Sequence, residues 1–530
     1  MAFRTGERRN NDMENPYGQV RLKLQLGLLK LSDLRDLNSK NSIVEVSDAA
    51  RPRIERGRAV IDSLVATGTR TYGVNTGFGS MAGHTIDEGD LAKLQHRLVV
   101  SNAAGTGPLM SDRDVRCMLL LKLNALATGQ SGVRPALIDA LLAVLNAGII
   151  PAVPVKGSVG ASGDLAPLAH MAATLIGVGD AKLGGETMSA TKALTRCNLK
   201  PFVLAAKEGL ALVNGTQAST ALAVAGLFAA ENVFAAGIVA GSLSLEAALG
   251  QDMAFDDRLH RARGQSGQRV VAGAYRALLE GSHIRALALA KGRMQDPYSL
   301  RCQPQVMGAC LDVMRHVASI LSAEINAWTD NPMVDVDTGD ILYGGNFHAE
   351  PVALAADTLA LAIAEIGSMS ERRIAMLTDA HHSMLPAFLV KETGLDSGFM
   401  VAHVTAAALA SENKSLAHPA SVDSIPTTAN HEDFVSMATF AARRLEDLAE
   451  NVATIVAIEL LAAAQGLEFR RPALSSPKLE EIHAAIRQKI PAYNEDRFFA
   501  PDIAVVKTMV RGGFFCSYVP SALHASATTS

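Results

Sequence analysis

Apolar residues recur at helical spacing through the second half of this 530-residue chain. The longest such stripe consists of Leu445, Leu448, Val452, Ile455 and Ala462. These spacings place the side chains on one face of a helix, with Glu459 as the one polar member and Gly466 at the expected end. The stripe predicts a long helix that packs against other helices.

Four further runs rich in alanine and leucine have the same character and lie at residues 216–248, 306–327, 351–376 and 401–414. Together they predict a mainly α-helical fold built around a long central bundle that is shared between subunits. The segment 219–250 is apolar enough to suggest a membrane span, but Glu231, Asn232 and Glu246 interrupt it. We therefore expect a buried helix there, and no membrane as a partner.

The first part of the chain has a different pattern, in which helical stretches alternate with glycine-dense turns at 72–83, 103–108 and 156–164. Glycine at this density permits close backbone approach and positive φ angles, so we expect the chemistry in these loops. The expected organisation is a mobile arm, an active-site domain, the central bundle and a C-terminal helical extension, at residues 1–20, 21–214, 215–480 and 481–530.

Composition and charge narrow the class of protein. Apolar residues make up 48% of the chain and aromatic residues 5%, so aliphatic side chains must build the core. The formal net charge of -4 offers no basic excess for nucleic acid. The N-terminus has no apolar stretch of the kind that a secretory signal needs, which predicts a cytoplasmic protein.

The five cysteines lie far apart and include no C-x-x-C pair, which is typical of a reducing compartment and excludes a zinc knuckle. We expect their side chains to be buried in the apolar core. They are Cys117, Cys197, Cys302, Cys310 and Cys516.

Three common catalytic motifs fail on spacing. Asp164 stands where a hydrolase nucleophile elbow requires glycine after Ser162. The glycines at 77 and 79 are followed by Gly83, one residue too late for a dinucleotide fingerprint. The 14 histidines form no H-E-x-x-H pattern, so we expect no catalytic metal.

The segment 157–170 reads GSVGASGDLAPLAH and resembles the signature of the aromatic amino acid ammonia-lyases. Further blocks of resemblance are YGVNTGFG at 72, EGLALVNGTQ at 208, QDPYSLRCQPQVMGA at 295, GGNFHAEPVALAAD at 344 and SGFMVAHVTAAALASENK at 397. The resemblance extends from Tyr72 to Met437 and is strongest to the subgroup that acts on histidine. It implies a fumarase/aspartase-like helical fold and a homotetramer with shared active sites.

In this family an Ala-Ser-Gly tripeptide cyclises without help into 4-methylideneimidazol-5-one (MIO). The resemblance assigns that role to Ala161, Ser162 and Gly163, with no metal or diffusible cofactor. The amide nitrogen of Gly163 must attack the carbonyl of Ala161, and Ser162 must lose water, so only small side chains allow the backbone to fold back tightly enough.

The family removes ammonia and a β-proton from an aromatic amino acid, which needs an electrophile for the amine and a base for the proton. By resemblance, Tyr72 is that base, although a tyrosine pKa of about 10 requires a neighbouring cation or dipole. Gly79 is implied to bring backbone close to the MIO, Asn214 to hold the MIO and the substrate, and Phe347 to line the ring pocket.

The stretch 295–301 predicts a short helix capped by Asp296, with Tyr298 and Arg301 on one face and directed into one cavity. A guanidinium binds a carboxylate through two parallel donors, so Arg301 is the candidate clamp for the substrate carboxylate. The resemblance adds Gln295 to carboxylate binding and Tyr298 to the catalytic residues. An ordinary ion pair of Arg301 is the structural alternative.

Two positions depart from the histidine-specific pattern. Asn102 stands where that subgroup has the histidine that contacts the substrate ring, and the Q-E-D-H motif becomes His431-Glu432-Asp433-Phe434. Glu432 favours histidine as substrate, Asn102 suits an imidazole or a phenol, and Phe434 adds an apolar wall. His431 is interpreted as a polar partner rather than a base.

The expected activity is conversion of histidine to urocanate. A tyrosine or phenylalanine ammonia-lyase, an MIO-dependent 2,3-aminomutase and a non-enzymatic binding protein remain as alternatives. One side chain at position 102 is sufficient to decide the substrate, because a site that pairs a polar ring group rejects an analogue without it by roughly 10⁴.

Overall fold

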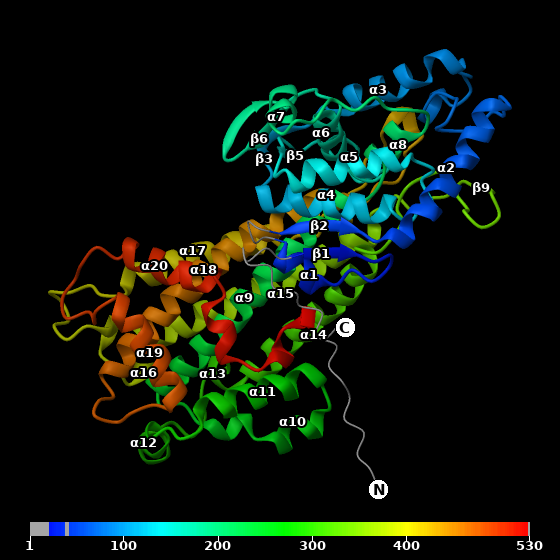
Figure 1. The fold of residues 1–530 in the computed structure, drawn as a ribbon. Coiled ribbons are helices and arrows are strands. Elements are labelled where there is room, and N and C mark those ends of the chain that lie inside the picture. The colour runs from blue at the N-terminus through cyan, green and yellow to red at the C-terminus, as the bar shows by residue number, and fades with distance from the viewer. Residues whose placement is uncertain (1–20, 38–41, 528–530) are drawn as a thin grey trace, which may run out of the picture.

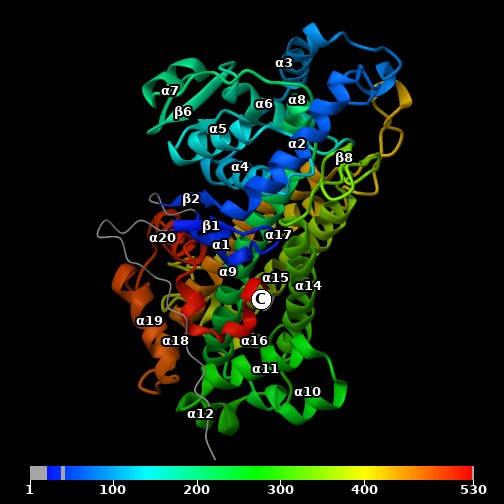
Figure 2. The same cartoon turned by 45° about the vertical axis from the view of Figure 1, so that its right-hand side comes forward.

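Five long helices run side by side and form the centre of the protein (Figures 1 and 2). The computed structural model describes residues 21–37 and 42–527, so the predicted arm at 1–20 lies outside the described residues. The long helices confirm the predicted bundle. They are α9 (Gln217–Ala247), α14 (Gln303–Glu324), α15 (Glu350–Thr378), α17 (Met400–Leu416) and α18 (Ala438–Glu468).

Helix α9 is the axis of the bundle. By length and composition α9, α14 and α15 could each cross a membrane, but 94% of the apolar window of α9 is buried inside the protein. Its two acids are paired: Glu231 with Arg35, and Glu246 with Ser475, whose Oγ lies 2.7 Å from Oε2. The prediction of a buried protein helix is therefore confirmed.

Helix α18 packs directly against α9 because Gly226 has no side chain at the contact. A Cβ there would lie 2.5 Å from Cδ1 of Leu445. The one polar residue of the predicted stripe, Glu459, accepts hydrogen bonds from Nε of buried Arg373 at 2.5 Å and from Oγ of Ser244 at 2.6 Å. The prediction that Gly466 ends the helix is wrong: the helix continues to Glu468, and Gly466 lets it pass close to α9.

Shorter helices and strands, all but β8 and β9 from the first part of the chain, cover one end of the bundle (Figure 1). The strands form small sheets, of which β1 and β2 pair in parallel and β3–β5, β4–β6–β7 and β8–β9 are antiparallel. The helices are α1 (Leu31–Asp36), α2 (Arg51–Ala66), α3 (Leu91–Asn102), α4 (Asp112–Leu126), α5 (Pro135–Asn146), α6 (Leu165–Leu175), α7 (Ala190–Arg196) and α8 (Glu208–Val213). The strands are β1 (Arg21–Leu24), β2 (Ile43–Val46), β3 (Thr106–Leu109), β4 (Ile150–Pro151), β5 (Pro154–Lys156), β6 (Asp180–Leu183), β7 (Glu186–Ser189), β8 (Met333–Val334) and β9 (Ile341–Leu342).

The opposite end of the bundle carries a second group of short helices (Figure 1). They are α10 (Asp257–Arg263), α11 (Ser266–Leu279), α12 (Ile284–Lys291), α13 (Tyr298–Arg301), α16 (Ala380–Ser383) and α19 (Pro477–Lys489). Helix α20 (Ala500–Arg511) lies along the flank of the bundle, where Asn232 of α9 donates to the carbonyl oxygen of Arg511. Because a helix rises 1.5 Å per residue, the 31 residues of α9 separate the two ends by about 45 Å.

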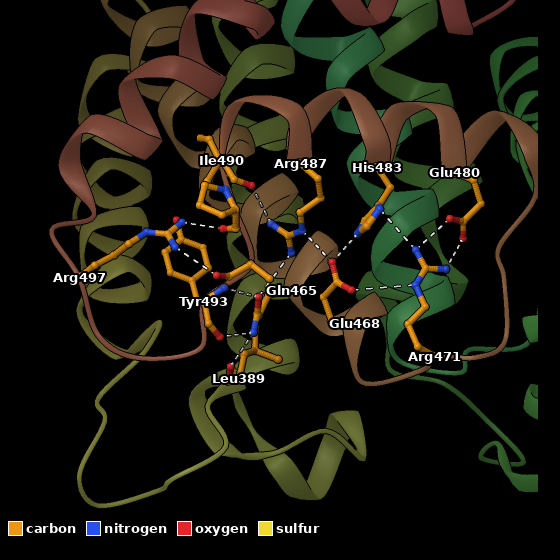
Figure 3. Close-up of polar contacts among 12 residues, drawn as sticks. Leu389, Gln465, Glu468, Arg471, Glu480, His483, Arg487, Ile490, Tyr493 and Arg497 are labelled. Carbon is orange, nitrogen blue, oxygen red and sulfur yellow. Dashed lines mark hydrogen bonds and ion pairs between the residues drawn. The ribbon is translucent and has the colours of Figure 1, made fainter.

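An ionic network holds α19 against the end of α18 (Figure 3). Oε1 of Glu468 lies 2.8 Å from Nε of Arg487 and 3.0 Å from Nε2 of His483. Arg471 donates two parallel hydrogen bonds to Glu480, at 2.8 and 2.9 Å. These contacts fix the C-terminal region to the bundle with directional bonds in addition to apolar packing.

The cysteines are only partly as predicted. All five are free thiols, and Cys117 and Cys310 are buried. Cys197, Cys302 and Cys516 are partly exposed, so the prediction that their side chains are buried in the core is wrong. Cys197 and Cys302 lie where short helices end, and Cys516 lies in the short 3₁₀ helix Phe514–Tyr518.

Candidate active site

The 157–164 loop lies directly before α6 and is tightly folded. Gly163 has a φ of +74°, and a Cβ there would lie 2.1 Å from the carbonyl oxygen of Gly215. Only glycine fits this position. Its neighbours Ala161 and Ser162 are small, so the three residues meet the steric requirement for ring closure into MIO.

Asp164 ties this loop to the bundle. Its fully buried carboxylate accepts hydrogen bonds from the amide and hydroxyl of Ser219, at 2.7 and 2.8 Å, and from Oγ1 of Thr439 at 2.6 Å. Burial raises the pKa of Asp164 above its usual value, and these hydrogen bonds offset part of the rise. Since Ser219 and Thr439 belong to α9 and α18, the rigid bundle fixes the loop.

The loop forms part of the wall of a cavity of about 800 Å³. The cavity has room for an amino acid with an aromatic ring, since ligand sites commonly enclose 300–1,000 Å³. Eight of the predicted site residues line it, namely Tyr72, Gly79, Asn102, Ala161, Ser162, Asn214, Phe347 and Glu432. They come from six separate regions of the chain.

Tyr72 is held by the glycine-rich turn that follows it. Its phenol oxygen accepts a hydrogen bond from the amide of Gly79 at 3.2 Å, and its ring packs edge to face on Phe78. The amide of Gly79 therefore places a backbone N–H dipole at the phenol oxygen of Tyr72.

Glu432 faces the tripeptide across the cavity. Its Oε1 accepts a hydrogen bond from Oγ of Ser162 at 2.7 Å, and its Oε2 accepts bonds from the hydroxyls of Thr427 and Thr428, both at 2.7 Å. Burial by itself would raise the pKa of Glu432, but the three hydroxyl donors outweigh it and lower that pKa below its usual value. The carboxylate is therefore charged at neutral pH.

Asn102 is the last residue of α3 and directs one half of its amide into the cavity. Its Nδ2 donates to the carbonyl oxygen of Leu98 at 2.7 Å, one turn earlier in the same helix. This bond fixes the orientation of the amide and uses one of its two N–H donors, which leaves Oδ1 and the second N–H for a ligand. Asn102 therefore presents an acceptor that a ring with a donor can match.

Asn214 is positioned by residues that the sequence did not single out. Its Nδ2 donates to Oδ1 of Asp330 at 3.1 Å, and Oδ2 of Asp330 lies 2.6 Å from Nζ of buried Lys207. A second buried lysine, Lys122, donates to the carbonyl oxygen of Asn214 at 2.6 Å. The sequence feature that could have identified Lys122 is its position as the single charged residue in the apolar run MLLLKLNALA of α4.

The cavity mouth carries the residues of the altered motif. Phe434 is 63% exposed and stacks on the ring of His348, with centroids 6.1 Å apart. His431 is exposed and lines the same rim. The exposed Arg97 of α3 also lines the cavity and is a cation that the sequence analysis missed.

Gln295, Tyr298 and Arg301 are not brought to this cavity within one chain. They belong to the region of α13, at the opposite end of the bundle (Figure 1). Tyr298 is 70% exposed, and the guanidinium of Arg301 lies 4.7 Å from the centre of its ring. This contact confirms the shared face. Both residues lie outside the cavity that Ser162 lines.

The predicted helix cap in this segment is wrong. Pro297, without a side-chain cap, precedes α13. The carboxylate of Asp296 instead accepts hydrogen bonds from the amide of Gln251 at 2.5 Å and from Nη2 of Arg293 at 3.0 Å. Asp296 therefore bonds to Gln251, which is distant in sequence, and not to the backbone of its own helix, because Asp296 is almost fully buried against the end of α9.

No group of three or more histidine, cysteine, aspartate or glutamate side chains is placed to hold a metal ion within residues 21–37 and 42–527.

A long helical bundle with a reactive glycine loop at one end defines a lyase-type helical enzyme. Residues 29–488 match the family model of the aromatic amino acid lyases, and the chain belongs to this family. The chain is 57% identical over 497 residues to a histidine ammonia-lyase of Aromatoleum aromaticum, a match that covers 94% of each protein.

Solved structures show the same relationship. The crystal structure of histidine ammonia-lyase from Trypanosoma cruzi superposes with a TM-score of 0.88 at 40% identity, covering 96% of this chain and 97% of that one. Tyrosine aminomutase from Streptomyces globisporus superposes with a TM-score of 0.89 at 34% identity, covering 94% and 98%. The resemblance seen in the sequence blocks is thus confirmed over nearly the whole chain.

Proposed function

We propose that the protein is a histidine ammonia-lyase that releases ammonia from L-histidine and forms urocanate, a reaction of histidine metabolism. The observation that carries the proposal is the juxtaposition of Ser162, Tyr72 and Glu432 in one cavity. The high identity to histidine ammonia-lyases over 94% of the chain supports histidine as the substrate.

The tripeptide at 161–163 suits the formation of MIO. The amide nitrogen of Gly163 bonds to the carbonyl carbon of Ala161 with loss of one water, and Ser162 loses its hydroxyl and α-hydrogen as a second water. When formed, MIO supplies an electrophile that makes the amine of the substrate a better leaving group. Ala161, Ser162 and Gly163 provide all its atoms, so no separate cofactor is needed.

Three side chains then act on the substrate. Tyr72 takes the β-proton, with the amide of Gly79 stabilising the resulting charge on its oxygen. Glu432 loses its hydroxyl donor once Ser162 has dehydrated, so its Oε1 becomes available to the amino group of the substrate. Asn102 accepts a hydrogen bond from the ring through Oδ1.

Asn102 also determines which rings fit. Imidazole and phenol both carry a donor for Oδ1, whereas a phenyl ring has none and would leave a buried acceptor unpaired. Glu432 and the identity to histidine enzymes favour imidazole over phenol. Tyrosine is therefore the second candidate substrate and phenylalanine the poorest of the three.

The test is turnover of histidine, tyrosine and phenylalanine, followed by the ultraviolet absorbance of each arylacrylate and by release of ammonium. We expect histidine to be preferred. Replacing Asn102 with leucine, which has a similar volume, should shift the ratio of kcat/KM for phenylalanine over histidine upward by roughly 10²-fold or more. An unchanged ratio would show that Asn102 does not select the ring. A β-amino acid product instead of ammonium would identify an aminomutase.

The proposed assembly is a homotetramer whose active sites draw on several subunits. Arg301 and Tyr298 lie about 45 Å from Ser162 along the bundle, too far to bind the same amino acid within one chain. The buried Nε of Arg301 has no hydrogen-bond partner among the described residues. Apolar side chains are exposed on the flanks of the bundle, as subunit packing requires, at Leu354, Leu361, Val401 and Val404.

Complementation tests the shared site. The variants Ser162→Ala and Arg301→Ala should each be nearly inactive alone. When they are co-expressed, random mixing should restore about a quarter of the wild-type activity, because about one site in four receives both intact parts. If the mixture stays inactive, each site comes from one chain. If Arg301→Ala alone is fully active, another cation such as Arg97 binds the carboxylate.

The proposed location is the cytoplasm. All five cysteines are free, and unpaired thiols persist in a reducing compartment.

A further inference from the structure

Lys122 is a buried amine whose hydrogen bonds go only to backbone. It lies in α4, is 1% exposed, and its Nζ donates to the carbonyl oxygens of Ala211 at 3.1 Å and Asn214 at 2.6 Å. Both carbonyls belong to the C-terminal end of α8 and the turn that follows it. No carboxylate accepts a hydrogen bond from this amine among the described residues.

The peptide group that Lys122 holds lies beside the tripeptide. The carbonyl of Asn214 belongs to the Asn214–Gly215 peptide, and the amide of Gly215 points at the carbonyl oxygen of Ser162, 3.4 Å away. The carbonyl oxygen of Gly215 accepts a hydrogen bond from the amide of Asp164 at 2.8 Å. Lys122 and the backbone of Ser162 thus contact opposite edges of one peptide group, the first at its carbonyl oxygen and the second at its N–H.

The charges around Lys122 do not explain its burial. Asp330 is the nearest opposite charge, but its Oδ2 is already paired with Lys207 at 2.6 Å. Burial is the main cause that lowers the pKa of Lys122 to about 7; Asp330 opposes it, Lys207 adds to it, and Asp164 opposes it less. An amine buried without its own carboxylate costs free energy, which the two carbonyl contacts offset only in part.

We propose that Lys122 is a positioning residue for ring closure: it fixes the Asn214–Gly215 peptide, which in turn holds Ser162 and Gly163 folded back on Ala161. The inference rests on the proposed formation of MIO. Closure requires the amide nitrogen of Gly163 to reach the carbonyl carbon of Ala161 and to expel water. A rigid partner peptide removes the conformational freedom that opposes this approach.

The test compares three variants by the intact mass of the full-length protein. Lys122→Met keeps the apolar stem and removes the donors, whereas Lys122→Gln keeps an N–H donor. Glu459→Gln is the control, because it disturbs a buried charge pair elsewhere in the bundle without touching the loop. For each, the ratio of protein that has lost two waters to protein that has not is measured, together with the thermal midpoint and the helical circular dichroism.

We expect complete loss of two waters in the wild type and in Glu459→Gln. Lys122→Met should fold, but its ratio of dehydrated to unmodified protein should fall at least about tenfold, with Lys122→Gln between the two. If Lys122→Met does not fold, the test rests on Lys122→Gln. A ratio of dehydrated to unmodified protein below that of the wild type supports the role of Lys122, and an unchanged ratio contradicts it.

Complete dehydration in a folded Lys122 variant would overturn the proposed role of Lys122. It would leave the proposed MIO untouched. The same is true if Glu459→Gln loses dehydration in proportion to its thermal midpoint, because a general loss of stability would then explain the effect. Absence of the two-water loss in the wild type would overturn the proposed MIO itself, and the two failures are therefore distinct.

Discussion

Replacing Ser162 with alanine should abolish turnover while leaving the fold intact. Alanine has no hydroxyl to lose, so the electrophile that captures the amine cannot form, and the rate should fall by at least roughly 10³-fold, as for removal of a covalent catalytic group. Stability should change little, because dehydration already removes the Ser162 hydroxyl from the mature wild type, so the alanine variant loses no hydrogen bond to Glu432 that the mature protein makes.

The measurement is kcat with histidine, together with intact mass. Ser162→Ala should show no loss of two waters. Ser158→Ala is a matched control, because Ser158 belongs to the same loop and its Oγ accepts a hydrogen bond from the amide of Gly160 at 3.1 Å, but it contributes no atom to the ring. Wild-type rates in Ser162→Ala would rule out an MIO mechanism.

Replacing Tyr72 with phenylalanine should lower kcat by roughly 10²–10⁴-fold, the usual range for loss of a general base. The ring should remain packed on Phe78, so the shape of the cavity is kept. The amide of Gly79 loses its acceptor, at a cost of about 1 kcal/mol. Ring formation at 161–163 does not involve the phenol, so the mass should still show the loss of two waters.

A normal mass with a low rate would assign Tyr72 to the reaction rather than to maturation. Tyr343→Phe is the control, because Tyr343 is 59% exposed and directly precedes Gly344, which lines the cavity, but does not line the cavity itself. It should keep the wild-type rate. A near-normal kcat in Tyr72→Phe would mean that another group removes the β-proton.

The two wrong predictions of helix ends share one cause. Asp296 was expected to cap its own helix, and Gly466 was expected to end one, because both rules describe local backbone. In the protein Asp296 binds the amide of Gln251, and Gly466 packs against Ala247. Each residue is buried against α9, and tertiary contact outweighs local preference of about 1 kcal/mol.

The sequence alone predicted the long helices, and it identified the tripeptide at 161–163 that we propose to form MIO. The spacing of apolar residues is a property of each helix, and ring closure involves three consecutive residues. Both can therefore be predicted without knowledge of the tertiary structure. Tyr72, Asn102 and Asn214 were likewise identified from motifs, and all three line the cavity.

Only the tertiary structure decided which groups act together. Glu432 meets Ser162 across 270 residues of sequence, and Lys122 reaches Asn214 from another helix. The same fold separates Arg301 from Ser162 by the length of α9. Spacing along the chain carries no information about such distances, because they depend on how rigid helices pack against one another.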